Sequence, residues 1–214
     1  MKKMNTNPYG TETRAYACEI TTREDEKRGH VIEGHPIVYN AETNIGGMWL
    51  ERIDPAALQD TDLKDVMLLV NHDRTGIPLA RSRNNNDNST MKLSVTEDGL
   101  HIRADIDSNN PRGAELLSAV SRGDIAGMSF AFTVEEDRWE DLETDLPRRT
   151  ITKIGRVMEV SAVNNPAYEQ TSISTRSLDQ AIETLESEKR ALERAKEDAR
   201  LRAEILNSLK EVRQ

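Results

Sequence analysis

The chain has 214 residues, of which 36% are hydrophobic and 4% aromatic, and it carries a formal net charge of −9. This length suits one domain of about 150 to 180 residues with an appended segment rather than two large domains. The acidic balance argues against a nucleic-acid partner, and no apolar run reaches the roughly 18 residues that a membrane-spanning helix needs. A single cysteine excludes an intramolecular disulfide, and with no visible export signal we expect a protein of the reducing cytoplasm.

The first part of the sequence alternates short segments rich in Val, Ile and Thr with clusters of Gly, Asn, Asp and Pro, a pattern typical of a strand-rich domain. Strands are predicted at residues 15–20, 31–39, 48–52, 66–71, 79–83, 92–95, 100–105, 128–139 and 150–163. Short helices are predicted at residues 56–59 and 112–121, because each follows a capping residue and a proline, Asp54-Pro55 and Asn110-Pro111.

The composition changes near residue 177. From there to residue 214 the chain has no Gly or Pro, and apolar residues recur at seven-residue intervals, which predicts one long amphipathic helix. Lys189 and Lys196 interrupt its second apolar seam, so we expect weak or partner-dependent pairing of this helix. The predicted organisation is a flexible N-terminus at residues 1–12, a mainly β domain at 13–176 and a helical tail at 177–214.

His72 is the first candidate for chemistry. It follows the apolar run at 66–70 and ends a predicted buried strand, where side chains commonly project into a site. A surface histidine hydrogen-bonded to Asn71 or Asp73 is the alternative. Of the remaining histidines, we expect His30 to be solvated and His35 and His101 to be structural residues within strands.

Ser129 is the second candidate, because it begins a Ser-Phe-Ala-Phe segment that holds the only two phenylalanines of the chain. Strand alternation places both rings on one face and the small Ser129 and Ala131 on the other, which leaves room for a ligand. Gly123 and Gly127 shape the approach to this segment, and free backbone N–H groups there would face an oxyanion. An ordinary serine in a strand is the alternative.

Glu159 is the third candidate. It lies in an otherwise apolar strand segment, where a buried carboxylate needs a partner. Alternation places Val157, Glu159 and Ser161 on one face, and if that face lines the same cavity as His72, the carboxylate orients the imidazole. An edge-strand glutamate facing water is the alternative. A nucleophile, a base and a carboxylate on separate strands suit acyl transfer, although the chain has no Gly-x-Ser-x-Gly elbow.

An ordered set of segments resembles the prohead, or capsid maturation, proteases of tailed bacteriophages over about residues 13–176. The segments are Ile32-Glu33-Gly34 to Tyr39-Asn40, Leu69-Val70-Asn71-His72-Asp73, Pro78-Leu79-Ala80-Arg81, Asp98-Gly99-Leu100, Ala104-Asp105-Ile106-Asp107, Ser121-Arg122-Gly123, Ile125-Ala126-Gly127-Met128-Ser129-Phe130-Ala131-Phe132, Glu159-Val160-Ser161 and Asn165-Pro166-Ala167-Tyr168. The resemblance implies a serine endopeptidase in which His72 is the general base and Ser129 the nucleophile. Glu159 stands on the strand that should supply the third member, and no metal or organic cofactor is implied.

The resemblance also implies a mainly β (α+β) fold, built as a small closed β-barrel with peripheral short helices, similar to the herpesvirus assembly proteases. It implies cleavage of the scaffold, or of the scaffolding segment of the major capsid protein, and self-cleavage, inside the assembling prohead in the host cytoplasm. The tail at 177–214 would dock on scaffold helices, be removed by processing or mediate self-association. A catalytically inactive assembly or scaffolding factor acting through the tail and a small-molecule esterase are the alternatives.

Overall fold

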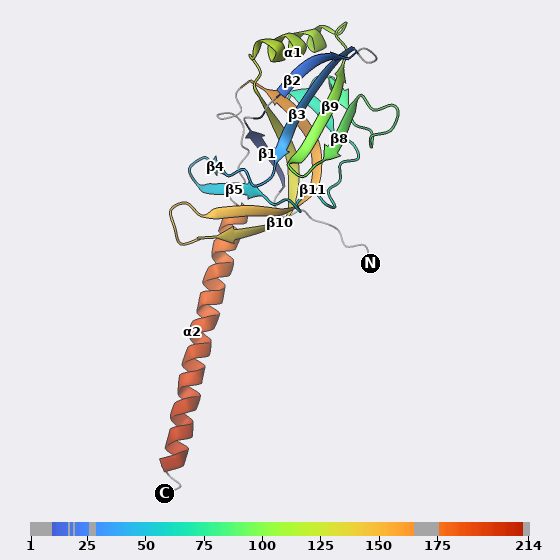
Figure 1. Ribbon diagram of the computed structural model, residues 1–214. Coiled ribbons are helices and arrows are strands. Elements are labelled where there is room, and N and C mark those ends of the chain that lie inside the picture. The colour runs from blue at the N-terminus through green and yellow to red at the C-terminus, as the bar shows by residue number, and fades with distance from the viewer. Residues whose placement is uncertain (1–9, 17, 19, 26–28, 165–175, 212–214) are drawn as a thin grey trace. The chain divides into compact units, whose positions relative to one another are not determined.

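The computed structural model describes residues 10–16, 18, 20–25, 29–164 and 176–211 (Figure 1). Packing divides the chain into two compact units, residues 1–174 and 175–214. The first unit holds all the strands of the described residues and one helix, and the second holds one long helix. The predicted mainly β character of the first part is therefore confirmed.

The strands of the first unit form two sheets. The larger has seven strands in the order β1-β10-β11-β5-β4, with β6 paired to β11 and β7 to β6. These strands are β1 (Thr11–Tyr16), β4 (Thr43–Ile45), β5 (Trp49–Ile53), β6 (Met67–Val70), β7 (Ala80–Arg81), β10 (Gly127–Glu140) and β11 (Arg148–Val163). The smaller sheet is antiparallel, with the order β2 (Ile20–Asp25), β3 (Gly29–Val38), β9 (Gly99–Ile106) and β8 (Met91–Val95).

The predicted closed barrel is wrong for the part of the chain that the structure describes. There β3 pairs with β2 and β9, and β10 pairs with β1 and β11, so no ladder joins the two sheets into one ring. The single strand predicted at 15–20 is two strands, because β1 belongs to the larger sheet and β2 to the smaller. The two sheets instead share one apolar core, in which side chains of both are buried.

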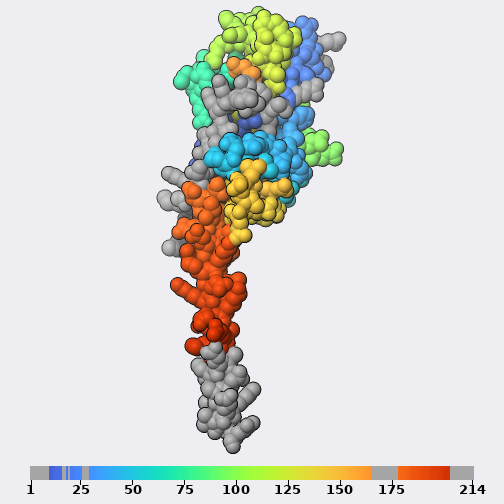
Figure 2. Space-filling model, turned by 90° about the vertical axis from the view of Figure 1, so that its left-hand side faces the viewer, coloured from blue at the N-terminus to red at the C-terminus, as the bar shows by residue number. Residues whose placement is uncertain are grey.

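β11 organises the larger sheet. β10 runs antiparallel along its whole length, from the Gly127–Val163 pair to the Glu140–Arg148 pair. On its other side β11 pairs with two parallel strands, β5 near its start and β6 near its end. Figure 2 shows the face on which β4 and β5 adjoin the turn end of β10 and β11. Because β6 pairs with the last part of β11, the residues that follow β6 emerge beside that part.

The helix α1 (Pro111–Arg122) begins and ends as its sequence predicts. The Asn110 side chain accepts the N–H of Arg112, a proline occupies the first turn, and Gly123 ends the helix in the left-handed conformation that glycine adopts without a steric penalty. Three aliphatic side chains of α1, Leu116, Leu117 and Val120, are buried in the core. Figure 1 shows α1 beside β2 at one end of the domain.

Two further predictions differ from the structure. Residues 56–59 form consecutive turns rather than a helix, with the N–H of Ala57 donating to the carbonyl of Asp54. The flexible N-terminus predicted for residues 1–12 is wrong at its end, because Thr11 and Glu12 belong to β1 and Glu12 is fully buried. Residues 1–9 lie outside the description.

The second unit contains the helix α2 (Arg176–Glu211), as the seven-residue repeat predicts. Leu192, which belongs to this repeat, and Leu201, which lies outside it, are both more than half exposed. Within the described ranges, no helix combines the length and the apolar composition that crossing a bilayer requires.

Candidate active site

A left-handed turn carries His72 from the end of β6 toward β11. Asn71 and His72 have φ angles of 48° and 58°, a conformation that non-glycine residues adopt infrequently and that clusters at functional sites. Three hydrogen bonds hold the turn: the N–H of Asn71 donates to the Ala162 carbonyl, that of His72 to Ser161 Oγ, and that of Asp73 to the Val70 carbonyl. Two of the three acceptors belong to β11, so the turn is fastened to that strand.

The imidazole of His72 contacts Glu159 directly, with 2.6 Å between Nδ1 and Oε1. Glu159 is fully buried, and its second oxygen, Oε2, accepts the hydroxyl proton of Ser161 at 2.7 Å. Arg74, half exposed, has Nη2 3.9 Å from Oε1. The buried carboxylate thus has the partner that its position in an apolar strand requires.

The contact with Glu159 determines what the rest of the imidazole can do. A neutral imidazole that donates from Nδ1 to a carboxylate has its lone pair on Nε2. Nε2 of His72 is buried and has no hydrogen-bond partner among the described residues. The ring is therefore oriented as a base whose accepting nitrogen is not occupied by any residue that the structure describes.

A β-bulge directs Glu159 to this site. Between β10 and β11, Ala131 pairs with Glu159 but the next residue, Phe132, pairs with Val157, so Met158 is the extra residue. Val157 therefore lies on the phenylalanine face, in the core, whereas Glu159 lies on the face of Ala131. The prediction that Val157 and Glu159 share one face is wrong, because it assumed an uninterrupted alternation.

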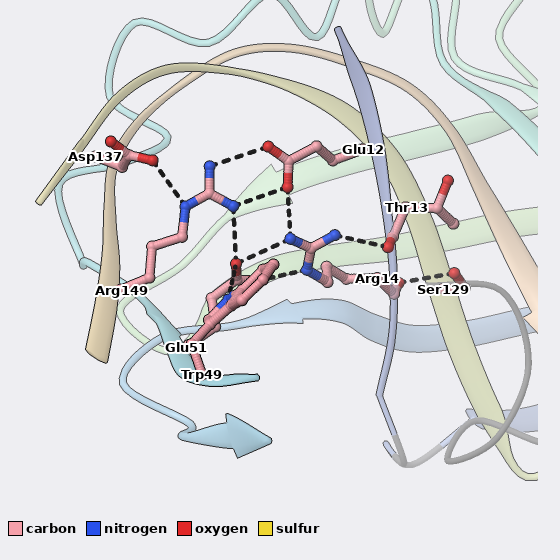
Figure 3. Close-up of polar contacts among 8 residues, drawn as sticks. All are labelled: Glu12, Thr13, Arg14, Trp49, Glu51, Ser129, Asp137 and Arg149. Carbon is pink, nitrogen blue, oxygen red and sulfur yellow. Dashed lines mark hydrogen bonds and ion pairs between the residues drawn. The ribbon is translucent and has the colours of Figure 1, made fainter. Parts of the chain in front are cut away.

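Ser129 lies one strand away from the His72–Glu159 pair. Its partner across the ladder is Ser161, and paired residues of antiparallel strands have Cα atoms about 4.5–5.5 Å apart and side chains on the same face. The Ser129 hydroxyl donates to the carbonyl of Arg14 in β1, at 2.7 Å (Figure 3). The structure thus joins His72 to Glu159 and places Ser129 on the neighbouring strand, with its hydroxyl directed at β1.

The space predicted beside Ser129 is not open in this structure. Ser129 and Ala131 are both fully buried, and the two phenylalanine rings stack on the opposite face with centroids 4.6 Å apart. Gly123 does not supply an oxyanion donor, because its N–H donates to the carbonyl of Val120 at the end of α1.

The structure holds a buried ion cluster that the sequence analysis did not predict (Figure 3). It lies on the face of β10 that carries Phe130 and Phe132. Glu51 accepts hydrogen bonds from both Arg14 and Arg149, Glu12 also binds both guanidinium groups, and Arg149 binds Asp137 at 2.7 Å. Burial acts to raise the pKa of the Glu51 carboxyl, but the two arginines outweigh it and the pKa is lowered. For Asp137 burial prevails and the pKa is raised despite Arg149.

The signal for this cluster was present in the sequence. Charged residues stand at alternate positions of β1, as Glu12 and Arg14 do, with further ones at Glu51 and Arg149. Charged side chains of opposite sign on neighbouring strands can pair with one another in a core. The assumption that charged residues are exposed misses such a cluster. The guanidinium of Arg14 also lies 5.7 Å from the centroid of the Phe132 ring.

A cavity of about 530 Å³ lies beside the histidine turn. Val70 and Asn71 line one side, and the lining from α1 and the segment after it is partly apolar and partly charged. These residues are Arg112, Glu115, Leu116, Ser118, Ala119, Arg122, Asp124 and Ile125.

The other histidines and the last resemblance segment lie elsewhere. His35 and His101 form a structural pair with ring centroids 4.8 Å apart, and His30 lies partly exposed in β3. The segment Asn165-Pro166-Ala167-Tyr168 lies outside the described residues.

Several known proteins are similar to this chain. The family model described as caudovirus prohead serine protease matches residues 18–185. The prohead protease of Enterobacteria phage HK97 is 28% identical over 167 residues, which are 78% of this chain and 68% of that protein. The solved structure of the bacteriophage T4 capsid assembly protease is 15% identical, covers 72% of this chain and 99% of that one, and gives a TM-score of 0.38. From the match over residues 18–185, the chain belongs to the caudovirus prohead serine protease family and is a serine protease.

Proposed function

We propose that this prohead serine protease cleaves peptide bonds with Ser129 as nucleophile, His72 as general base and Glu159 as the carboxylate that orients the imidazole. The observation that carries the proposal is the 2.6 Å contact between His72 Nδ1 and Glu159, which leaves Nε2 to accept a proton. Ser129 supports it by standing on the adjacent strand, opposite Ser161.

The reaction would follow acyl transfer in two steps. Ser129 rotates away from the Arg14 carbonyl, Oγ bonds to the scissile carbonyl carbon and its proton passes to His72 Nε2. His72 returns this proton to the leaving amine as the C–N bond breaks, which leaves an acyl-enzyme. Water then attacks the ester carbon, gives one proton to Nε2, and Ser129 is released when that proton returns to its oxygen.

The proposed substrate is protein: the scaffold, or the scaffolding segment of the major capsid protein, and the protease itself. The support is the family match, whose description names a prohead protease. The reaction would take place inside the assembling prohead in the host cytoplasm. The exposed leucines of α2 support a helix that pairs with scaffold helices or with a second copy, and release of α2 would be one self-cleavage.

The cavity beside Asn71 is the proposed site for a substrate side chain. It adjoins the histidine turn, and its apolar part is formed by Val70, Leu116 and Ile125. An extended substrate would lie along a strand edge, bound by main-chain hydrogen bonds, with one of its side chains in this cavity.

The test compares the wild-type protein with Ser129→Ala. Both full-length proteins are incubated with the capsid protein of the same phage and with its scaffold, and the products are identified by intact mass. Defined fragments from the wild type alone are expected, and their masses give the cleavage sites in the substrate and in residues 165–175 or α2. Equal cleavage by Ser129→Ala would exclude Ser129 as the nucleophile.

A further inference from the structure

Ser161 makes two hydrogen bonds with the catalytic pair. Its hydroxyl donates to Glu159 Oε2 at 2.7 Å and accepts the backbone N–H of His72 at 3.2 Å. Glu159 Oε1 in turn contacts His72 Nδ1. These three contacts form a closed ring that runs from the buried Ser161 hydroxyl through the Glu159 carboxylate and the His72 imidazole to the His72 backbone.

From this ring we infer that Ser161 is a positioning residue of the protease, which sets the orientation of Glu159 and the turn that carries His72. The inference rests on the proposed triad. Ser161 has one proton, and donating it to Oε2 turns Oε1 toward the imidazole. Its lone pair holds the N–H of His72, whose left-handed backbone costs free energy that surrounding contacts must offset. One hydroxyl thus fixes both partners of the Nδ1–Oε1 contact.

The strand that carries Glu159 and Ser161 keeps the positions of their side chains fixed. Glu159 and Ser161 lie two residues apart on the same face of β11, paired with Met67 and Leu69 of β6 on one side. Both side chains are fully buried. A site built on a strand holds its groups within a fraction of an ångström, which proton transfer requires.

Ser161 is not placed to act as the nucleophile. Its proton is directed at Glu159, and its contact with His72 is to the backbone rather than to the imidazole. Ser129, across the ladder from it, donates only to a backbone carbonyl. The two serines therefore have separate tasks, reaction for Ser129 and orientation for Ser161.

The experiment measures the second-order rate constant for labelling of Ser129 by a fluorophosphonate in the full-length protein. Labelling forms the Oγ–P bond, expels fluoride and transfers the serine proton to His72, so it needs no protein substrate. Ser161→Ala is expected to lower the rate constant roughly 10- to 100-fold. Ser161→Thr, which keeps a hydroxyl, is expected to restore most of the rate.

Ser82→Ala is the matched control. Ser82 is also fully buried and accepts a backbone N–H, that of Val66 at 3.1 Å, but it contacts no member of the triad. The labelling rate constant of Ser82→Ala should equal that of the wild type, while urea unfolding shows a loss of stability similar to that of Ser161→Ala.

A readout that needs no activity completes the test. In Ser129→Ala, the proton between His72 Nδ1 and Glu159 should give a sharp low-field resonance, and adding Ser161→Ala should broaden or remove it. An unchanged resonance, or a Ser161→Ala protein that labels like the wild type, overturns the inference and leaves the triad in place. An equal loss of labelling rate in Ser161→Thr, which keeps the hydroxyl, overturns it too. Labelling of Ser161 in Ser129→Ala would instead refute the proposed triad.

Discussion

The hydroxyl of Ser129 donates to the main-chain carbonyl of Arg14 at 2.7 Å, and the guanidinium of the same arginine is bound by buried carboxylates (Figure 3). The proposed nucleophile and the ion cluster therefore meet at one residue of β1. The cluster fixes that strand from the phenylalanine face, and the backbone of the strand holds Ser129 from its edge. Stability of β1 and the resting position of the nucleophile are thus linked.

Breaking the cluster should be costly. Glu51→Gln removes the charge that both Arg14 and Arg149 bind, which leaves buried cations short of a partner. We expect the free energy of unfolding in urea at neutral pH to fall by about 3–5 kcal/mol. Asp65→Asn, which breaks the exposed pair with Arg81, should cost less than about 1 kcal/mol. Equal costs for the two variants would mean that the cluster is not a buried unit.

The Glu159→Gln variant should lose activity without losing its fold. The amide cannot stabilise the imidazolium that forms when His72 accepts the serine proton, so fluorophosphonate labelling should slow by about 10³- to 10⁴-fold, as for the equivalent change in other serine proteases. Glu135→Gln, which breaks the half-buried pair with Lys153, is the control and should label normally. Near wild-type labelling of Glu159→Gln would remove this carboxylate from the triad.

His101 should make stability depend on pH. Burial lowers the pKa of His101 below its ordinary value of 6.5, and His35 lowers it further, while Glu33 acts in the opposite direction. A lowered pKa means that the folded state prefers the neutral ring, so the contribution is complete above pH 6.5 and is lost as the pH falls through the folded pKa. Urea unfolding from pH 8 to 5 should show this loss, and His101→Gln should reduce the slope. A slope unchanged by the substitution would assign the effect to other groups.

Gly99 should tolerate no side chain. Its φ is +144°, and a Cβ there would lie 2.0 Å from the carbonyl oxygen of Ile37, so Gly99→Ala should destabilise the domain by at least about 2 kcal/mol. Gly47 also has a positive φ, +75°, but open space around it, so Gly47→Ala should cost only about 1 kcal/mol. Thermal unfolding of the two variants measures the difference, and equal shifts in Tm would show that crowding at Ile37 is relieved by movement of β3.

The parts of the fold that depend on local signals were predictable. Asn110, Pro111 and Gly123 mark the ends of α1 through capping and backbone preferences, and these act within a few residues. A local argument also predicted that a buried Glu159 has a partner, because a carboxylate in an apolar strand needs one. That this partner is His72 depends on the pairing of β6 with β11.

The parts of the fold that depend on pairing between distant strands could not be predicted from the sequence. The division of residues 15–20 between two sheets depends on which strands β1 and β2 join, and the alternation of side chains is the same in either sheet. The burial of Glu12 depends on Arg149, 137 residues away, which no local pattern shows. For the same reason the sequence did not indicate that the Ser129 hydroxyl would meet the Arg14 carbonyl.

The bulge in β11 has a consequence for how the chain tolerates changes in length. Met158 is the extra residue, so deleting it should leave Val157 in the core and Glu159 beside Ala131, each opposite its present partner in β10. Deleting Val160 instead would turn the residues on one side of the gap to the other face and separate Ser161 from Glu159. Among neighbouring positions of this strand, Met158 is therefore the one at which we expect the chain to tolerate a deletion and keep Glu159 beside Ala131.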